Sequence, residues 1–274
     1  MVASHFAKAN IIFNDVSDYL PPGIILTLAA GLVENRKYWE VYKKELIGTV
    51  LMVVFTFSAG KWVGVNSLEV AWACHACGVV AADYFGGGQH VNPAVTVSMF
   101  ALNKCSYTEA FVRVAGQMAG GMVAFPLFHA VADAFGLTPF GGPEFSIEEN
   151  GEAALSEFLA MFLLCWVIYI LNWEMNFGKN HYWIKQFLTA FAIRALIEYF
   201  PTAGPAMNPM LGTTWHSWGV DQRFEFPKEN EHYFVYWVAP SVSAILASVT
   251  YAIWNGDRVF GQKMPGPIRK VKKS

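Results

Sequence analysis

The sequence predicts an all-α membrane protein. Three observations lead to this prediction: the composition, the charge-free runs and the placing of the charged loops. Hydrophobic residues make up 54% of the 274 residues, and Asp, Glu, Lys and Arg together make up 15%. A soluble domain usually carries about 25% charged residues, and so apolar a surface would aggregate in water. The composition also excludes intrinsic disorder, and the net charge of −2 gives no electrostatic basis for binding nucleic acid.

The first element in chain order is an N-terminal extension, residues 1–38. It contains an apolar stretch within residues 19–33, which includes Pro21 and Pro22. This stretch is too short to span a bilayer as a helix, which takes about 20 residues. We expect it to form an interfacial helix or a re-entrant segment.

Six membrane spans follow, because six runs carry no charge or almost none and reach about 20 mostly apolar residues with their flanks. The runs are 46–60, 70–82, 114–132, 158–173, 184–197 and 233–256. Basic residues cluster before the first run, between the second and third, between the fourth and fifth, and in the tail 257–274, whereas the connections between the third and fourth runs and between the fifth and sixth runs are acidic. Basic loops stay in the cytosol, so both termini are predicted to be cytosolic.

Two further apolar runs, 84–103 and 199–220, are not predicted to span. Both contain Gly and Pro clusters, which a lipid-facing helix would not tolerate. Each lies after the second span of a three-span half, and each holds an Asn-Pro pair. They are predicted to form a loop followed by a short helix, buried in protein.

The two halves, about 39–132 and 153–256, are predicted to be an inverted repeat. Glu45 and Glu157 lie at the first span of each half, and almost the same length of chain separates these glutamates as separates the two Asn-Pro pairs. Because each half has an odd number of spans, the second half has the opposite orientation in the bilayer. An inverted repeat places a substrate path at the interface between its halves.

The Asn-Pro pairs have a physical role in this arrangement. Asn is a good helix cap, and Pro suits the first turn, where its missing N–H costs nothing. Two half-helices that enter from opposite faces would bring their positive ends together near the middle of the membrane. Asn92 and Asn208 would then offer side-chain amides to a water oxygen, while the paired positive ends repel protons and cations.

With these features the chain resembles the aquaporins, the major intrinsic protein family. Residues 90–96, His-Val-Asn-Pro-Ala-Val-Thr, are similar to the first signature of that family, and Gln117 matches its third-span glutamine. The resemblance covers about residues 40–256. It implies a homotetramer with one pore per subunit and no cofactor, with His90 lining the cytosolic pore mouth or tying down its loop. The motif residues that it assigns to the pore are Asn92, Pro93, Ala94, Asn208, Pro209 and Met210.

The sequence departs from the family pattern at the outer filter. Met210 stands where the family usually has Ala, and Leu211 stands where the resemblance places an arginine. The other filter positions that the resemblance implies are Trp72, either Ile193 or Leu196, and a loop residue near Pro205. The expected filter is therefore apolar, which resembles the divergent intracellular branch of the family and favours an internal membrane over the plasma membrane.

The ionisable residues in or near the spans have two interpretations each. Glu45 and Glu157 either act in function, as intramembrane carboxylates often do, or accept hydrogen bonds from the N–H groups of the irregular loops. Arg194 either pairs with Glu198, one helical turn away, or supplies at the filter the positive charge that Leu211 lacks.

A Cys-His-Ala-Cys run at 74–77 raises the possibility of a metal site. Zinc normally takes four ligands, and no second Cys/His cluster accompanies the run. We therefore expect small residues that pack the second span, and no metal.

Two functions remain open. The first is a passive channel for water or small neutral solutes, such as glycerol-like molecules or hydrogen peroxide, in a lipid bilayer. The second is a structural or assembly subunit of a larger membrane complex, which keeps the fold without useful conduction. Met210 and Leu211 favour the second function, and the retained Asn-Pro pairs favour the first. An enzyme is not expected, because the sequence shows no nucleophile and base set, metal cluster or phosphate loop.

Overall fold

The computed structural model describes residues 36–57, 67–135, 142–218 and 225–266, and these residues are almost entirely helical. The α-helices are α3 (Arg36–Thr56), α4 (Leu68–Gly86), α5 (Pro93–Ala101), α6 (Tyr107–Ala134), α7 (Asn150–Tyr169), α8 (His181–Tyr199), α9 (Pro209–Trp218), α10 (Asn230–Tyr233) and α11 (Ala239–Asn255). Short 3₁₀ or π turns are η2 (Ile147–Glu149), η3 (Ile170–Glu174), η4 (Gly178–Asn180), η5 (Pro201–Ala203) and η6 (Phe234–Val238). The predicted all-α class is confirmed.

The six predicted spans are all helical. They correspond to α3, α4, α6, α7 with η3, α8, and the continuous segment from α10 to α11. Among the described residues, three segments are long and apolar enough to cross a membrane on length and composition alone: Tyr107–Val131, Ile147–Glu174 and Asn230–Asn255. The two runs with Asn-Pro pairs contain the short helices α5 and α9.

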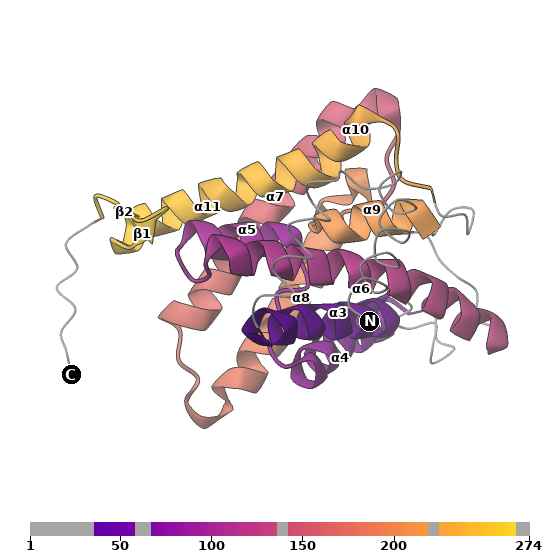
Figure 1. Cartoon of the computed structure of the whole chain (residues 1–274), viewed down its shortest axis with the longest axis horizontal. Helices are drawn as coiled ribbons and strands as arrows, with labels where there is room; N and C mark the ends of the chain where they lie inside the picture. The colour runs from indigo at the N-terminus through magenta and orange to yellow at the C-terminus, as the bar shows by residue number, and fades with distance from the viewer. Residues whose placement is uncertain (1–35, 58–66, 136–141, 219–224, 267–274) are drawn as a thin grey trace, which may run out of the picture.

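The helices pack as an inverted repeat. In the first half α3 packs against α4 and α6, and in the second half α7 packs in the same way against α8 and α11. Each short helix packs against the last span of the other half, α5 against α11 and α9 against α6. Figure 1 shows α5 and α9 in the middle of the molecule, between α11 and α6. The repeat therefore places the Asn-Pro pairs where the halves meet.

Glycine allows α3 and α6 to approach closely. A Cβ atom added at Gly116 would lie 2.7 Å from the carbonyl oxygen of Tyr42, and one at Gly120 would lie 2.7 Å from the carbonyl oxygen of Leu46. Any larger side chain would push the helices apart, and small residues at helix contacts are typical of membrane proteins.

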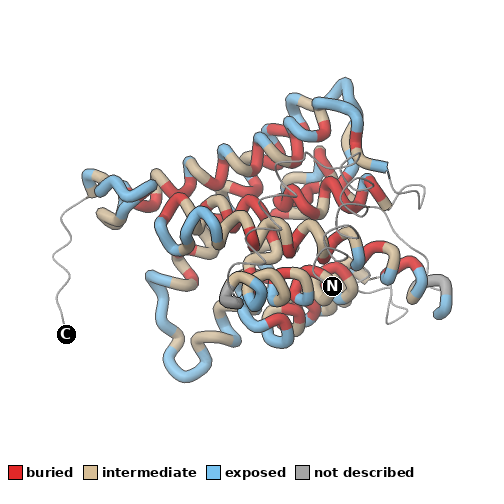
Figure 2. Tube along the Cα trace, viewed as in Figure 1, coloured by how far each residue is buried: buried red, intermediate tan, exposed pale blue. Residues whose placement is uncertain are grey.

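The outer faces of the peripheral helices are apolar and exposed. On α7, Leu155, Leu159 and Leu163 recur at helical spacing and are 40–57% exposed. Figure 2 shows buried and exposed positions alternating along α11, which runs along the upper edge of the molecule in this view. A continuous exposed apolar stripe would be unfavourable in water, so these faces suit contact with lipid.

The C-terminal end of the described chain forms a short hairpin. The proposed interfacial segment at 19–33 lies outside the described residues. The predicted C-terminal tail begins with a hairpin of β1 (Arg258–Val259) and β2 (Gln262–Lys263). The Phe260 N–H donates to the Ala101 carbonyl at 2.8 Å and ties this hairpin to the end of α5.

Candidate functional site

The two short helices begin at the Asn-Pro pairs. The Oδ1 atom of Asn92 accepts hydrogen bonds from the backbone N–H groups of Ala94 (2.8 Å) and Val95 (3.3 Å). The Oδ1 atom of Asn208 accepts from the N–H of Met210 at 3.1 Å. Both prolines occupy the first helical position, where no intrahelical partner is lost. Local sequence therefore explains why each helix begins where it does.

The two asparagines also bind each other's loop. The Nδ2 atom of Asn92 donates to the carbonyl oxygen of Met207 at 2.7 Å, and that of Asn208 donates to the carbonyl oxygen of Val91 at 3.0 Å. Val91 and Met207 both have positive φ, 49° and 47°, which turns their carbonyls toward the opposite half. A side-chain amide has two N–H groups, so each asparagine retains one for another molecule.

Glu45 and Glu157 accept hydrogen bonds from the two irregular loops. The carboxylate of Glu45 accepts from the N–H groups of His90 (3.0 Å) and Val91 (2.9 Å). In the second half, Glu157 accepts in the same way from Ala206 (2.6 Å) and Met207 (2.8 Å). Both glutamates are fully buried. Their contacts match the interpretation as acceptors for loop N–H groups.

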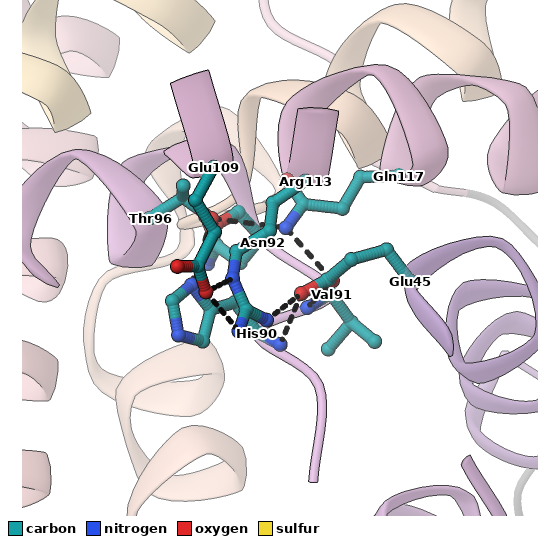
Figure 3. Close-up of polar contacts among 8 residues, drawn as sticks. All are labelled: Glu45, His90, Val91, Asn92, Thr96, Glu109, Arg113 and Gln117. Atoms are coloured by element: carbon teal, nitrogen blue, oxygen red, sulfur yellow. Dashed lines mark hydrogen bonds and ion pairs between the residues drawn. The ribbon is translucent and has the colours of Figure 1, made fainter. Parts of the chain in front are cut away.

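The first half has a cation beside its glutamate that the sequence analysis did not identify. The Nη1 atom of Arg113 lies 2.5 Å from Oε1 of Glu45, and Nη2 lies 2.8 Å from Oε1 of Glu109. Gln117 donates to Glu45 at 2.9 Å, as Figure 3 shows. The four-residue spacing of Glu109 and Arg113 was the available signal for part of this network. The contact with Glu45 needs tertiary structure.

His90 lies beside the start of α5. Its Nδ1 atom is 3.1 Å from the hydroxyl of Thr96, which also accepts a hydrogen bond from Gln117 at 2.9 Å (Figure 3). The residue lines the cavity described next. The contact with Thr96 ties the His90 side chain to α5, and its role at a cytosolic pore mouth stays a prediction.

A cavity of about 1040 Å³ lies between the two halves. Its lining includes Asn92 and Asn208, the residues that join the halves. Polar residues such as Asp83 and Tyr182 also line it, as does Pro143 in the loop before α7. Residues from both halves therefore surround a path that passes the asparagine amides.

The structure separates the predicted filter residues into two groups. Ile193, Arg194, Pro205 and Leu211 line the cavity, whereas Trp72 and Leu196 are not among its lining residues. Leu196 is instead buried in the core cluster with α5 and α11 residues. Of the two alternatives from the sequence, Ile193 is therefore the one at the cavity.

The position of Trp72 differs from the prediction because of the rotation of α4. The residues of this helix that line the cavity include Leu68, Ala71, His75 and Val79, which recur every three or four positions and so form one helix face. Trp72 lies about 100° around the helix from Ala71, and its ring is 6.3 Å from that of Phe191. His75 is a polar residue of this lining face that the filter prediction missed.

Met210 does not occupy the cavity. Its side chain is fully buried and lies beside α6, where a Cβ atom at Gly121 would be only 2.4 Å from its sulfur. The hydroxyl of Thr214 donates to the same sulfur at 3.3 Å. Gly121 on α6 thus leaves room for the Met210 side chain, which lies outside the cavity.

Arg194 forms the predicted ion pair and also reaches the cavity. Its Nη2 atom pairs with Oε1 of Glu198, four residues on in α8, while the residue lines the cavity. Within the described residues, no group of three or more His, Cys, Asp or Glu side chains could hold a metal ion.

Comparisons with known proteins agree with this geometry. The family model described as "Major intrinsic protein" matches residues 33–251. "Probable aquaporin PIP2-8" of Arabidopsis thaliana is 25% identical over 255 residues, covering 84% of this chain and 87% of that protein. "Glycerol uptake facilitator protein-like 6" of Lactiplantibacillus plantarum is 28% identical over 222 residues, covering 79% and 98%. The crystal structure of the aquaglyceroporin from Plasmodium falciparum is similar in fold, with a TM-score of 0.59, 21% identity and coverage of 78% of this chain and 95% of that one.

Proposed function

Because the chain belongs to the major intrinsic protein family, we propose that it is a passive channel for water and small neutral solutes. The observation that carries this proposal is the pair of asparagine amides beside one continuous cavity. Each amide uses one N–H to join the halves and retains a second. A water or hydroxyl oxygen that passes the junction can accept hydrogen bonds from both.

The same junction favours neutral molecules over ions. The N-termini of α5 and α9 meet there, and the partial positive charge at each helix N-terminus acts against cations and protons. The carboxylates of Glu45 and Glu157 are occupied by loop N–H groups. They therefore support the loops and leave the path without a strong cation site at this level.

Part of the cavity lining is apolar. Ile193, Ile197 and Leu211 belong to this part, and Arg194 is a charged residue of the same lining. Apolar side chains offer no hydrogen bonds to a polar solute, but they make favourable contacts with C–H groups. We infer that solutes less polar than water, such as glycerol-like molecules or hydrogen peroxide, also pass.

The proposal extends to the setting of the protein. The subunits form a homotetramer with one pore each, both termini face the cytosol, and an internal membrane is the favoured location. The charge distribution supports the orientation, because the acidic connection that contains Glu148 and the basic one that contains Lys179 fall on opposite faces.

The test is stopped-flow light scattering on proteoliposomes, with water, glycerol and hydrogen peroxide measured on the same preparation. We expect permeability to at least water or one of these solutes well above that of protein-free liposomes. If the purified, assembled protein raises none of the three, the channel proposal is wrong. The alternative, a structural subunit of a larger membrane complex, would then be the better explanation.

A further inference from the structure

The cavity lining includes a buried histidine on α4 that takes no part in joining the two halves. His75 lines the cavity on α4 and is only 8% exposed. Its Nδ1 atom is buried and forms no hydrogen bond within the described part of the chain. A buried N–H without a partner costs more than an unused lone pair, so the tautomer with the proton on Nε2 is favoured. That N–H is then available to a molecule in the cavity.

The pairing of α4 with α8 places Arg194 at the same level as His75. The two helices run antiparallel, and Asp83 accepts hydrogen bonds from the hydroxyl of Tyr182 at 2.7 Å and from the side chain of Gln186. His75 lies eight residues before Asp83 in α4, and Arg194 lies eight residues after Gln186 in α8. Eight residues of helix are about 12 Å long, so His75 and Arg194 lie equally far from the Asp83–Gln186 contact, in the same direction.

Arg194 has hydrogen-bonding capacity that its ion pair does not use. The Nη2 atom of Arg194 pairs with Glu198, and the buried Nε atom of Arg194 has no hydrogen-bond partner among the described residues. A guanidinium group carries five N–H donors, and the residue lines the cavity. The pair with Glu198 anchors the group in place and neutralises part of its charge, which suits binding of a neutral acceptor.

We propose that His75 and Arg194 form the selectivity site of this cavity and bind neutral solutes that carry hydroxyl groups on a short carbon chain. The proposal rests on the channel function and adds to it the residues that choose the solute. Hydroxyl oxygens accept from the two side chains, while the C–H edge faces Ile193 and Leu211, which line the same cavity. The two donors thus lie on two different spans, His75 on α4 and Arg194 on α8.

The test compares glycerol and water permeability of the full chain in proteoliposomes. His75→Phe keeps a ring of similar size and removes the donor, and His75→Gln restores an N–H. For His75→Phe we expect the ratio of glycerol to water permeability to fall about three- to tenfold, the range for loss of one hydrogen bond, with partial recovery in His75→Gln. The water permeability should change less, because a water molecule also forms hydrogen bonds with other waters in the path.

His129→Phe is the matched control. His129 is also a buried histidine, 7% exposed, whose ring nitrogens have no hydrogen-bond partner within the described residues. It lies on α6 and is not among the residues that line the cavity, so its replacement should leave the ratio unchanged. A ratio that falls equally in this control would overturn the proposal.

Arg194→Lys is a second test of the selectivity site. Lysine keeps the positive charge and can still pair with Glu198, but it lacks the planar set of N–H donors. We expect the glycerol to water ratio to fall at least threefold. If the wild-type protein conducts and its ratio is the same in His75→Phe and in Arg194→Lys, the selectivity site is wrong while the channel stands. If the wild-type protein conducts water but not glycerol, or hydrogen peroxide alone, the selectivity site is likewise wrong while the channel stands. If it conducts none of the three, the channel proposal itself fails.

Discussion

Gly121→Ala tests whether the Met210 side chain lies beside α6, outside the path. The added methyl group would be 2.4 Å from the Met210 sulfur, 2.7 Å from the Thr214 hydroxyl oxygen and 2.8 Å from its Cγ2, whereas unstrained contacts are about 3.5–4.0 Å. Because all three atoms are in buried residues, they cannot move into solvent to relieve the contact.

The expected size of the effect follows from two opposing contributions. Overpacking a buried site by one methyl group costs about 1–3 kcal/mol, and replacing Gly by Ala inside a helix returns about 1 kcal/mol. The net destabilisation is then about 1 kcal/mol. For a chain of this size that corresponds to a fall of about 2–4 °C in Tm.

Thermal unfolding in detergent, followed by circular dichroism, measures this change. In a Met210→Ala background the closest contact is gone, so Gly121→Ala should cost less there, and the double-mutant cycle should give a coupling of about 1 kcal/mol. Gly151→Ala is the control, because its Cβ atom would meet nothing within 4 Å. Equal effects of Gly121→Ala in the two backgrounds would show that the sulfur does not lie against Gly121.

Two further predictions concern the loops. Glu157→Gln leaves one acceptor oxygen for the two N–H groups of Ala206 and Met207, so it should lower the free energy of unfolding by about 1–3 kcal/mol. The control is Glu152→Gln at an exposed position, which should change the free energy of unfolding by less than about 0.5 kcal/mol. Equal melting temperatures for the two variants would refute the supporting role of Glu157. Glu148→Cys and Lys179→Cys should react with a membrane-impermeant maleimide from opposite faces of the membrane, and labelling of both from one face would refute the topology.

The sequence alone was sufficient for the class, the order of the helices and the inverted repeat. Composition and charge-free runs define the spans because lipid requires apolar side chains and internally bonded backbone. The Asn-Pro pairs also predicted where α5 and α9 begin, since capping is local: Asn92 bonds N–H groups two and three residues on. Chain symmetry then indicated that the two pairs meet.

Only the tertiary structure decided which side of each span faces the cavity. In a soluble helix, polar residues mark the outer face, but in α4 and α8 both the lipid-facing and the buried faces are largely apolar, so periodicity does not reveal the rotation of the helix. For that reason the sequence pointed to Trp72, and the structure to His75. Likewise the place of Met210 depends on Gly121, a residue on another helix, which no local pattern connects to it.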